Sequence, residues 1–477
     1  MLDIEGTKIM LDCGELYSAD KSKFPKDMEK KDIEGLKCII ISHAHLDHTG
    51  RLPKIVRFLG YKGPVFCTKE TSILLPVMLK MAVKYGDFGM ENFYYSKNNV
   101  KNRFAGKGIA VHSMPGCEYG SQIGKKGLVK CRRPELGPKG YFLCGKCAEM
   151  EAAETMENIV IVKPGGDVKI SDTVDAEFFY TSHLPGSVMT LLKDKKSGRN
   201  VLYSGDVGSD LSPFLTHNPL IKRRVDIAIV EATYGTAERT DEPDARLKFR
   251  EYVAKKLKEG KRIIIPVFVL DKSQQVFYEL SKGIRDAVIP LGTKITAFSP
   301  SMEALNALYC GQLRKEKGNF TGDFLSNGPF DPAQIKFPKG NKIVFGDISV
   351  ISSGAVDHIL SKAEMKKLIG DKNCCFIFIS YQDPETVGGI ISGNTGNMVE
   401  IGGKSYAANA EVMKFDCFSS HAQYGRIMSM LRGFEGLKKV LVVHLEGNSG
   451  GDVKKKYMVD LPGVKIIIPQ PYVKTDL

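Results

Sequence analysis

The chain has 477 residues, of which 43% are hydrophobic and 26% charged, and its formal net charge is +13. This length exceeds what one ordinary core fills and predicts two or three domains. No apolar run approaches the roughly 18–20 residues of a membrane-spanning helix, and the N-terminus lacks the features of a signal peptide. We therefore expect a cytoplasmic protein with no membrane partner. The positive charge favours a polyanionic partner, nucleic acid first, and leaves a merely basic enzyme open.

Strand and helix patterns alternate along the chain, which is typical of α/β layering. The first pattern, residues 8–14, is a strand that ends in an aspartate and a glycine turn. Further strands are predicted at 38–42, 65–67, 159–162, 176–180, 201–203 and 226–230, with a helix at 71–84. The last three strands run into polar residues at their C-terminal ends, where ligand sites collect in α/β sheets.

A second α/β block follows a polar stretch at 236–244. Its predicted elements are helix 245–257, strand 262–269, helix 272–284, strand 294–298, helix 302–313 and strands 342–345 and 375–380. The tail then adds a helix at 422–431 and a strand at 439–443. This order indicates a second domain inserted before the last elements of the chain.

Residues 117–147 break this pattern with many glycines, a cluster of basic residues and four cysteines, Cys117, Cys131, Cys144 and Cys147. The last two have the CxxC spacing of a zinc knuckle, and the first two could complete a Cys₄ site. The alternative, a loop with reduced thiols, has equal weight. The odd total of eleven cysteines favours reduced intracellular thiols over a disulfide framework.

Residues 43–50 read His-Ala-His-Leu-Asp-His-Thr-Gly and follow a short, apolar, strand-like run. Imidazole and carboxylate groups suit zinc or a similar divalent ion. His43 and His45 can point toward one ion, and Asp47 and His48 can serve a second ion nearby. Only nine histidines occur in the chain, so three within six residues indicate a metal site rather than ordinary core or surface histidines.

Further polar residues follow other strand-like runs, and in order they resemble the motifs of the metallo-β-lactamase superfamily and, within it, the β-CASP nucleases. The matches are Asp12, residues 43–48, His183, Asp206, Glu231 (motif A), His421 (motif B) and His444 (motif C). They cover nearly the whole chain. The RNA-processing branch, which includes RNase J, archaeal cleavage factors and the pre-mRNA 3′-end processing endonuclease, has histidine at motif C. The DNA-processing branch typically has valine there.

The resemblance implies an α/β fold, an αββα metallo-β-lactamase sandwich with an inserted α/β β-CASP cap. We expect residues 1–235 to form the first part of the core, with the insertion at 117–147, residues 236–412 the cap, and residues 413–477 the last part of the core. Family members usually have a strand pair ahead of the segment that matches Asp12. That piece is missing here, which predicts a sheet without its first strand and with an exposed edge.

The resemblance also implies two zinc ions. One would bind His43, His45 and His183, the other Asp47, His48 and His444, with Asp206 bridging them. The catalytic set would comprise Asp47, His421, Glu231 and Asp12. In it, His421 would donate a proton to the leaving oxygen with support from Glu231. Asp12 would orient a ligand histidine, although it could also simply cap a turn.

The implied function is a zinc-dependent ribonuclease that cuts single-stranded RNA, preferably as an endonuclease. An additional 5′–3′ exonuclease activity stays open, and so does a homodimer. Candidate phosphate or RNA contacts are Ser419, Ser420, Ser353, Gly354 and Lys272. The family's usual Gly-Arg is replaced here by Asp271-Lys272. One alternative is a non-catalytic RNA-binding β-CASP subunit, although such relatives usually lose ligands. A DNA nuclease is disfavoured by His444, and a small-molecule hydrolase by motifs A to C and the positive charge.

If the four cysteines of the insertion bind zinc, the purified protein will contain more than two metal ions per chain. Replacement of Cys144 and Cys147 by serine will then lower the metal content, because a Cys₄ site cannot close on two thiolates. Elemental analysis checks the count. Two ions per chain in a fully active protein would contradict a structural zinc.

Overall fold

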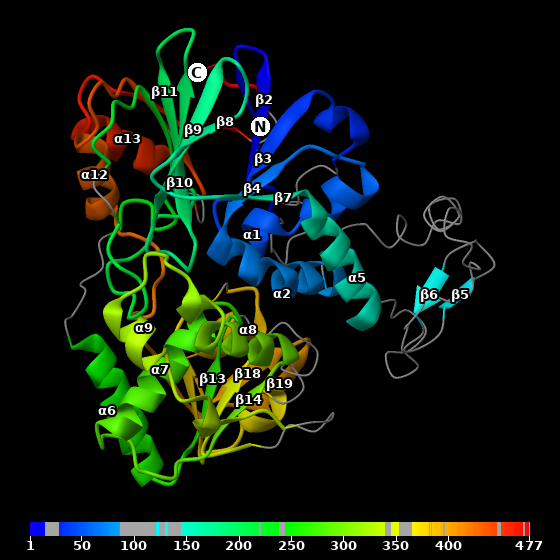
Figure 1. Cartoon of the computed structure of the whole chain (residues 1–477). Coiled ribbons are helices and arrows are strands. Elements are labelled where there is room, and N and C mark those ends of the chain that lie inside the picture. Colours follow the sequence, from blue (N-terminus) through cyan, green and yellow to red (C-terminus); the bar gives the residue numbers. More distant parts are fainter. Residues whose placement is uncertain are drawn as a thin grey trace.

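The computed structural model describes most of the chain. The described residues are 1–14, 28–85, 121–123, 129–131, 145–218, 221–237, 244–338, 345–352, 365–380, 382, 384–394, 396–445, 450–470 and 473–476. Three main sheets organise these residues (Figure 1). Among the described residues, no helix is both long and apolar enough to cross a membrane.

The first sheet has five strands in the order β1-β2-β3-β4-β7. They are β1 (Leu2–Ile4), β2 (Thr7–Leu11), β3 (Leu36–Ile40), β4 (Val65–Thr68) and β7 (Ile159–Val162). All neighbours pair in parallel except β1 and β2, which form an antiparallel hairpin. The expectation that the strand pair ahead of Asp12 is missing was therefore wrong. Glu5 and Gly6, both with positive φ, make its two-residue turn, the geometry that matches strand twist.

The second sheet has seven strands in the order β22-β21-β12-β11-β10-β9-β8. They are β8 (Asp167–Lys169), β9 (Val174–Tyr180), β10 (Val188–Asp194), β11 (Asn200–Tyr203), β12 (Ile227–Glu231), β21 (Lys439–Val443) and β22 (Lys465–Ile467). Strands β11, β12, β21 and β22 run in parallel. Because β10 is antiparallel to both β9 and β11, β9 shares their direction. The C-terminal ends of β9, β11, β12 and β21 therefore lie at one edge.

The two sheets pack face to face, and helices cover their outer faces, so the predicted αββα sandwich is confirmed. Buried side chains from both sheets, among them Ile9, Ile40, Phe178 and Leu192, form the central cluster. Helices α2 (Lys69–Tyr85) and α5 (Gly145–Thr155) cover the first sheet. Helices α12 (Tyr424–Arg432) and α13 (Gly450–Asp460) cover the second. A single-turn helix, α1 (Leu46–Thr49), follows β3.

A third, all-parallel sheet of order β15-β14-β16-β13-β17-β20 lies between β12 and β21 in the chain. Its strands are β13 (Arg262–Pro266), β14 (Ile295–Phe298), β15 (Ile335–Lys336), β16 (Ile348–Ile351), β17 (Cys374–Phe378) and β20 (Glu411–Lys414). Helices α6 (Ala245–Lys258), α7 (Lys272–Arg285), α8 (Pro300–Cys310), α9 (Gly322–Asn327) and α11 (Val387–Gly393) accompany it, with a hairpin of β18 (Met398–Ile401) and β19 (Lys404–Ala407). We call residues 244–414 the cap. Of the strand predicted at 342–345, only its last residue is described, and it is not in a strand.

The cap and the sandwich share one hydrophobic cluster. Phe214, in the loop after β11, is fully buried and packs edge-on against Tyr309 of α8. The next residue, Leu215, pairs with Phe320 of the cap in an isolated antiparallel bridge. Because the cluster continues across this joint, separating the cap from the sandwich would expose apolar surface.

The cysteine-rich insertion is described only in part. Cys117 and Cys144 lie outside the described residues. Cys131 falls in a short antiparallel pair of β5 (Ser121–Ile123) and β6 (Val129–Cys131), and Cys147 falls in α5. The zinc site predicted there stays a prediction. The seven cysteines whose side chains are described are free.

Replacement of Phe214 by alanine should lower the free energy of unfolding by about 3–5 kcal/mol, because it empties a fully buried aromatic position at the joint. Urea denaturation measures this change. Leu291→Ala is the matched control, since Leu291 is 92% exposed, and its change should stay within about 0.5 kcal/mol. A Phe214→Ala protein as stable as the control would contradict a shared core.

Candidate metal centre

The residues predicted to bind metal converge where the C-terminal ends of strands from both sheets of the sandwich meet. Asp12 follows β2, and His43 follows β3 by three residues. On the second sheet, His183 follows β9, Asp206 follows β11 and His444 follows β21. The side chains of the predicted set come together: Asp12, His43, His45, Asp47, His48, His183, Asp206, Glu231, His421 and His444. Their chemical roles stay predictions.

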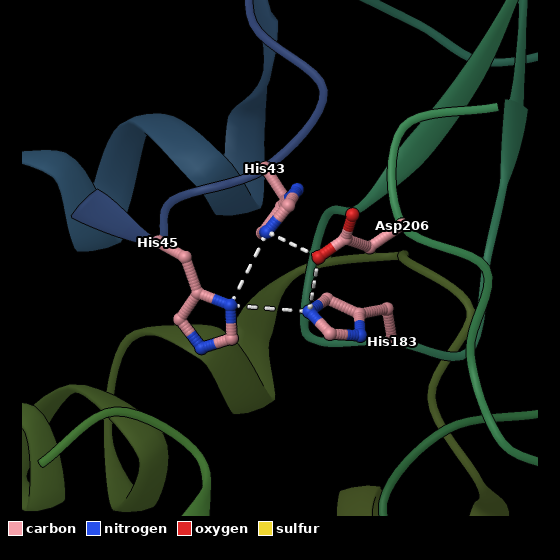
Figure 2. Close-up of side chains that lie close together, drawn as sticks. All are labelled: His43, His45, His183 and Asp206. Atoms are coloured by element: carbon pink, nitrogen blue, oxygen red, sulfur yellow. Dashed lines mark hydrogen bonds and ion pairs between the residues drawn. The ribbon is translucent and has the colours of Figure 1, made fainter. Parts of the chain in front are cut away.

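Three imidazoles face one carboxylate in a compact, buried cluster (Figure 2). The Nδ1 atom of His45 lies 3.2 Å from His43 Nε2 and 3.1 Å from His183 Nε2. Asp206 Oδ2 lies 3.5 Å from His43 Nε2 and 3.4 Å from His183 Nε2. Four donor atoms therefore point inward at one place, as ligands of a single cation do.

The other oxygen of Asp206 faces a second group. His48 Nε2 lies 3.4 Å from Asp206 Oδ1 and 3.7 Å from Asp47 Oδ2. His444 Nε2 lies 3.4 Å from the same oxygen of Asp47. Asp206 thus stands between two donor groups with one oxygen toward each.

The polar atoms of this centre fit a metal and lack other partners. Among the described residues, both carboxylate oxygens of Asp206 and the Nε2 atom of His48 are buried without a hydrogen bond. Buried polar atoms are almost always hydrogen-bonded, and an unpaired buried charge is costly. A cation supplies what these atoms lack, and the cluster is a metal site.

The protonation states of the first donor group suit metal ligands, whereas around the second group burial is outweighed by the carboxylates, which raise the pKa of His48 well above its usual value and that of His444 to about 9. Burial lowers the pKa of His43 and His183 well below the usual value, and lowers that of His45 to about 4. These imidazoles are neutral, as metal ligands must be. Burial alone would raise the pKa of Asp206, but the surrounding imidazoles, His48 first, outweigh burial and hold it well below its usual range.

The predicted positioning residue Asp12 binds four groups at once. Its Oδ2 atom accepts from His48 Nδ1 at 2.7 Å, Tyr203 OH at 2.6 Å and Ser42 Oγ at 2.6 Å, and its Oδ1 atom accepts from the Ser42 amide at 2.7 Å. Ser42 Oγ also lies 2.9 Å from His43 Nδ1. These bonds fix the rings so that the remaining nitrogens face the metal site.

Backbone geometry brings Asp206 close to this network. The preceding residue, Gly205, has φ of +52°, and a Cβ atom there would lie 2.6 Å from the Cβ of Ser42. Only glycine fits such a turn at this distance. The glycine that precedes Asp206 therefore has a steric cause.

His421 lies beside the metal cluster and pairs with Glu231. Its Nδ1 atom is 3.2 Å from both carboxylate oxygens of Glu231 and 3.9 Å from Asp206 Oδ2. Burial opposes the charged imidazole, but the carboxylates of Glu231 and Asp206 outweigh it and raise the pKa of His421 above its usual value. This is the setting of a proton donor.

Thr233 joins this pair to the metal cluster. Its hydroxyl donates to Glu231 and lies 2.9 Å from Nδ1 of His444, so it can accept from that ring. The Thr233 hydroxyl, like those of Tyr203 and Ser42, was not singled out in the sequence. Their partners lie far away along the chain, and no local pattern marks a hydroxyl that orients a ligand.

Of the candidate RNA contacts, those that the structure describes form hydrogen bonds within the protein. Ser419 bonds the Tyr234 hydroxyl, Ser420 Oγ donates to Asp271, and the Lys272 ammonium donates to the Phe418 carbonyl. Ser353 and Gly354 lie outside the described residues. A role of any of these five residues in RNA binding stays a prediction.

An open cavity of about 240 Å³ leads to the centre. It is lined by Asp12, Asp47, His48, Asp206, Glu231 and His444, together with Leu11, Gly14, Tyr203, Gly205 and Val443. All members of the second donor group, Asp47, His48, His444 and the shared Asp206, therefore border this cavity.

Comparison with known proteins also indicates similarity to metallo-β-lactamase proteins and ribonucleases. Residues 1–65 match the family model of the metallo-beta-lactamase superfamily. Ribonuclease TTHA0252 of Thermus thermophilus is 24% identical over 92% of this chain and 88% of its own length. Transcription termination factor FttA of Methanocaldococcus jannaschii is 22% identical over 92% of this chain, which spans 63% of that protein. Integrator complex subunit 11 of Danio rerio is 25% identical over 96% of this chain and 68% of its own length.

A solved structure of a protein of unknown function from Enterococcus faecalis aligns with 91% of this chain and 79% of its own, at a TM-score of 0.45 and 13% identity. The sequence relatives span more than nine-tenths of the chain, so they cover the sandwich and the cap together. The chain is therefore similar to these proteins over the inserted cap as well as the metal-bearing sandwich, and its first 65 residues match the metallo-β-lactamase superfamily.

Proposed function

We propose that this protein is a metal-dependent ribonuclease that hydrolyses phosphodiester bonds of single-stranded RNA, in RNA processing or decay in the cytoplasm. A relative named as a ribonuclease and others named for transcription termination and the Integrator complex support this class of reaction. The net charge of +13 favours a polyanionic substrate. We propose endonucleolytic cleavage as the principal mode.

Asp206 carries this proposal. It is a charged, buried carboxylate whose two oxygens face two separate groups of donor atoms. That arrangement suits two cations that share one bridging ligand, the constellation used in phosphodiester hydrolysis. We propose two Zn²⁺ ions, one held by His43, His45 and His183 and the other by Asp47, His48 and His444. Bound there, zinc supplies Lewis acidity, which lowers the pKa of water and offsets the negative charge of the phosphate.

His421 is the proposed proton donor. Hydrolysis adds water to phosphorus and breaks the bond to the leaving oxygen, which must receive a proton. Glu231 occupies Nδ1 of His421, so Nε2 is the atom that delivers this proton. The raised pKa favours the protonated imidazole, and Glu231 balances its positive charge until the proton is transferred, after which the ring is neutral.

The residues that hydrogen-bond to the proposed metal ligands have a positioning function in this proposal. Asp12, with Tyr203 and Ser42, orients His48 and His43, and Thr233 orients His444. We also propose the division of the chain into residues 1–235 and 413–477 as the catalytic core and 236–412 as the cap. The last cap strand reaches Lys414, just past that boundary.

Asp206→Asn should remove bound zinc and lower RNA cleavage at least about 100-fold, because it deletes the charge that both donor groups share. End-labelled RNA with 5′-triphosphate or 5′-monophosphate, with and without chelator, measures cleavage, and elemental analysis measures zinc. Asp210→Asn is the control, since this 39% exposed carboxylate pairs with His217 and Arg426 and belongs to neither donor group. Internal fragments indicate an endonuclease and mononucleotides an exonuclease. Chelator-resistant cleavage, or full activity in Asp206→Asn, would refute the proposal.

His421→Ala should lower the cleavage rate about 10²–10⁴-fold while RNA and zinc still bind, because a general acid contributes to the chemical step alone. Single-turnover cleavage, an RNA-binding titration and zinc content measure the three properties. His217→Ala serves as the matched control, because this imidazole is 76% exposed and away from the cluster. Undiminished cleavage in His421→Ala would end its assignment as the proton donor.

A further inference from the structure

Asp271, in the cap, adopts a backbone conformation that aspartate rarely takes. It directly precedes α7, with φ of 67° and ψ of −52°, and its side chain is 1% exposed. A positive φ of this kind favours glycine and strains other residues. Such strain persists only where surrounding contacts hold it.

The contacts that hold Asp271 lead out of the cap. Its Oδ2 atom accepts from Gln275 Nε2 at 2.5 Å within α7, and from Ser420 Oγ at 3.3 Å. Its Oδ1 atom accepts from the Tyr309 hydroxyl at 3.3 Å. The neighbouring Lys272 ammonium donates to the carbonyl of Phe418. Residues 271 and 272 thus hold both ends of the segment 418–420.

This segment crosses from the core of the cap to the metal centre within three residues. Phe418 is fully buried among cap residues, with its ring 5.0 Å from that of Phe249. Ser420 already belongs to the metal centre, since its carbonyl accepts from Nδ1 of His183 at 2.9 Å. Figure 2 shows the other nitrogen of this ring, Nε2, facing His45 and Asp206.

The next residue, His421, is the proposed proton donor and forms a backbone bridge with Gly208. A shift of Ser420 would therefore move two functional rings. It would release the hydrogen bond that orients His183, and it would displace His421 relative to Glu231. No other described carboxylate bonds the Ser420 side chain.

We propose that Asp271 is a positioning residue, through which the cap fixes the segment 418–421 and hence the orientation of His183 and His421. The strained conformation is retained because the carboxylate contacts Ser420, which glycine could not do. This inference rests on the proposed function for its link to cleavage, and on geometry alone for its link to metal binding.

The test compares three variants of the full chain. Asp271→Gly relieves the strain and removes the contact with Ser420. Asp271→Asn keeps an oxygen acceptor and tolerates positive φ. Ala287→Gly is the matched control, because Ala287 also has a positive φ, of 58°, yet is exposed and lies after α7, away from the metal centre.

We expect Asp271→Gly to weaken zinc binding about 10-fold, the lower end of the loss seen when a residue that hydrogen-bonds to a metal ligand is removed. The same variant should lower kcat about 10-fold and leave KM little changed. Its Tm without metal should equal or exceed that of the parent protein, since strain is relieved. Asp271→Asn should retain both properties within about three-fold, and Ala287→Gly should match the parent protein. Competition with a chromophoric chelator measures zinc affinity, and single-turnover cleavage with Michaelis kinetics measures kcat and KM.

Zinc affinity and kcat of Asp271→Gly equal to those of Ala287→Gly would overturn the inference. So would a loss in Asp271→Gly that comes with an equal loss in Asp271→Asn and a lower Tm, which indicates damage to the cap. If the parent protein cleaves no RNA, the proposed function fails. The zinc affinities still decide whether Asp271 positions His183.

Discussion

The centre depends on one electrostatic constraint, the burial of the charged Asp206 carboxylate. Its side chain is 1% exposed, and among the described residues neither oxygen has a hydrogen-bond partner. Removing an ion from water costs several kcal/mol even after relaxation. The surrounding imidazoles lower this cost only partly, because burial also drives His43 and His183 toward their neutral forms. Neutral His43 and His183 beside a charged carboxylate make the first donor group complete only with a cation, so the same burial that would destabilise the protein prepares it to bind metal.

The fold determines that these groups meet. Asp12 and His43 come from the parallel strands of one sheet, and Asp206 and His444 from parallel strands of the other. No single sheet carries a complete donor group, since the imidazoles of 43 and 45 need His183 and Asp206 from across the sandwich. Packing of the two sheets and formation of the centre are therefore one event. The network around Asp12 extends across this same boundary through Tyr203.

The sequence identified the histidines and carboxylates that converge at the centre and missed the hydroxyls that contact them. Histidines and aspartates after apolar strands are visible because their residue type and position are both unusual, and the ordered motifs identified the family. Thr233 and Tyr203 carry no such signal, since a hydroxyl is a common residue type and its partner lies far away in sequence. Strand β10 was missed for a related reason. Six of its seven residues are buried, so it lacks the alternation that marks a half-exposed strand.

The departure Asp271-Lys272 was visible in the sequence, but its meaning was not. Read along the chain, it only replaces the family's usual Gly-Arg and leaves open what the arginine would contact. In the structure, both side chains point to the segment that leaves the cap and carries His421. Among the described residues the cap supplies no member of the donor groups, yet it holds the segment that carries His421, the proposed proton donor. Because His183 is anchored on that segment while Asp47 and His48 are anchored elsewhere, a change in the cap would act unequally on the two donor groups. The sandwich therefore supplies the donor atoms of the centre, and in our proposal the cap determines how His421 and one of these donors, His183, are aligned with them.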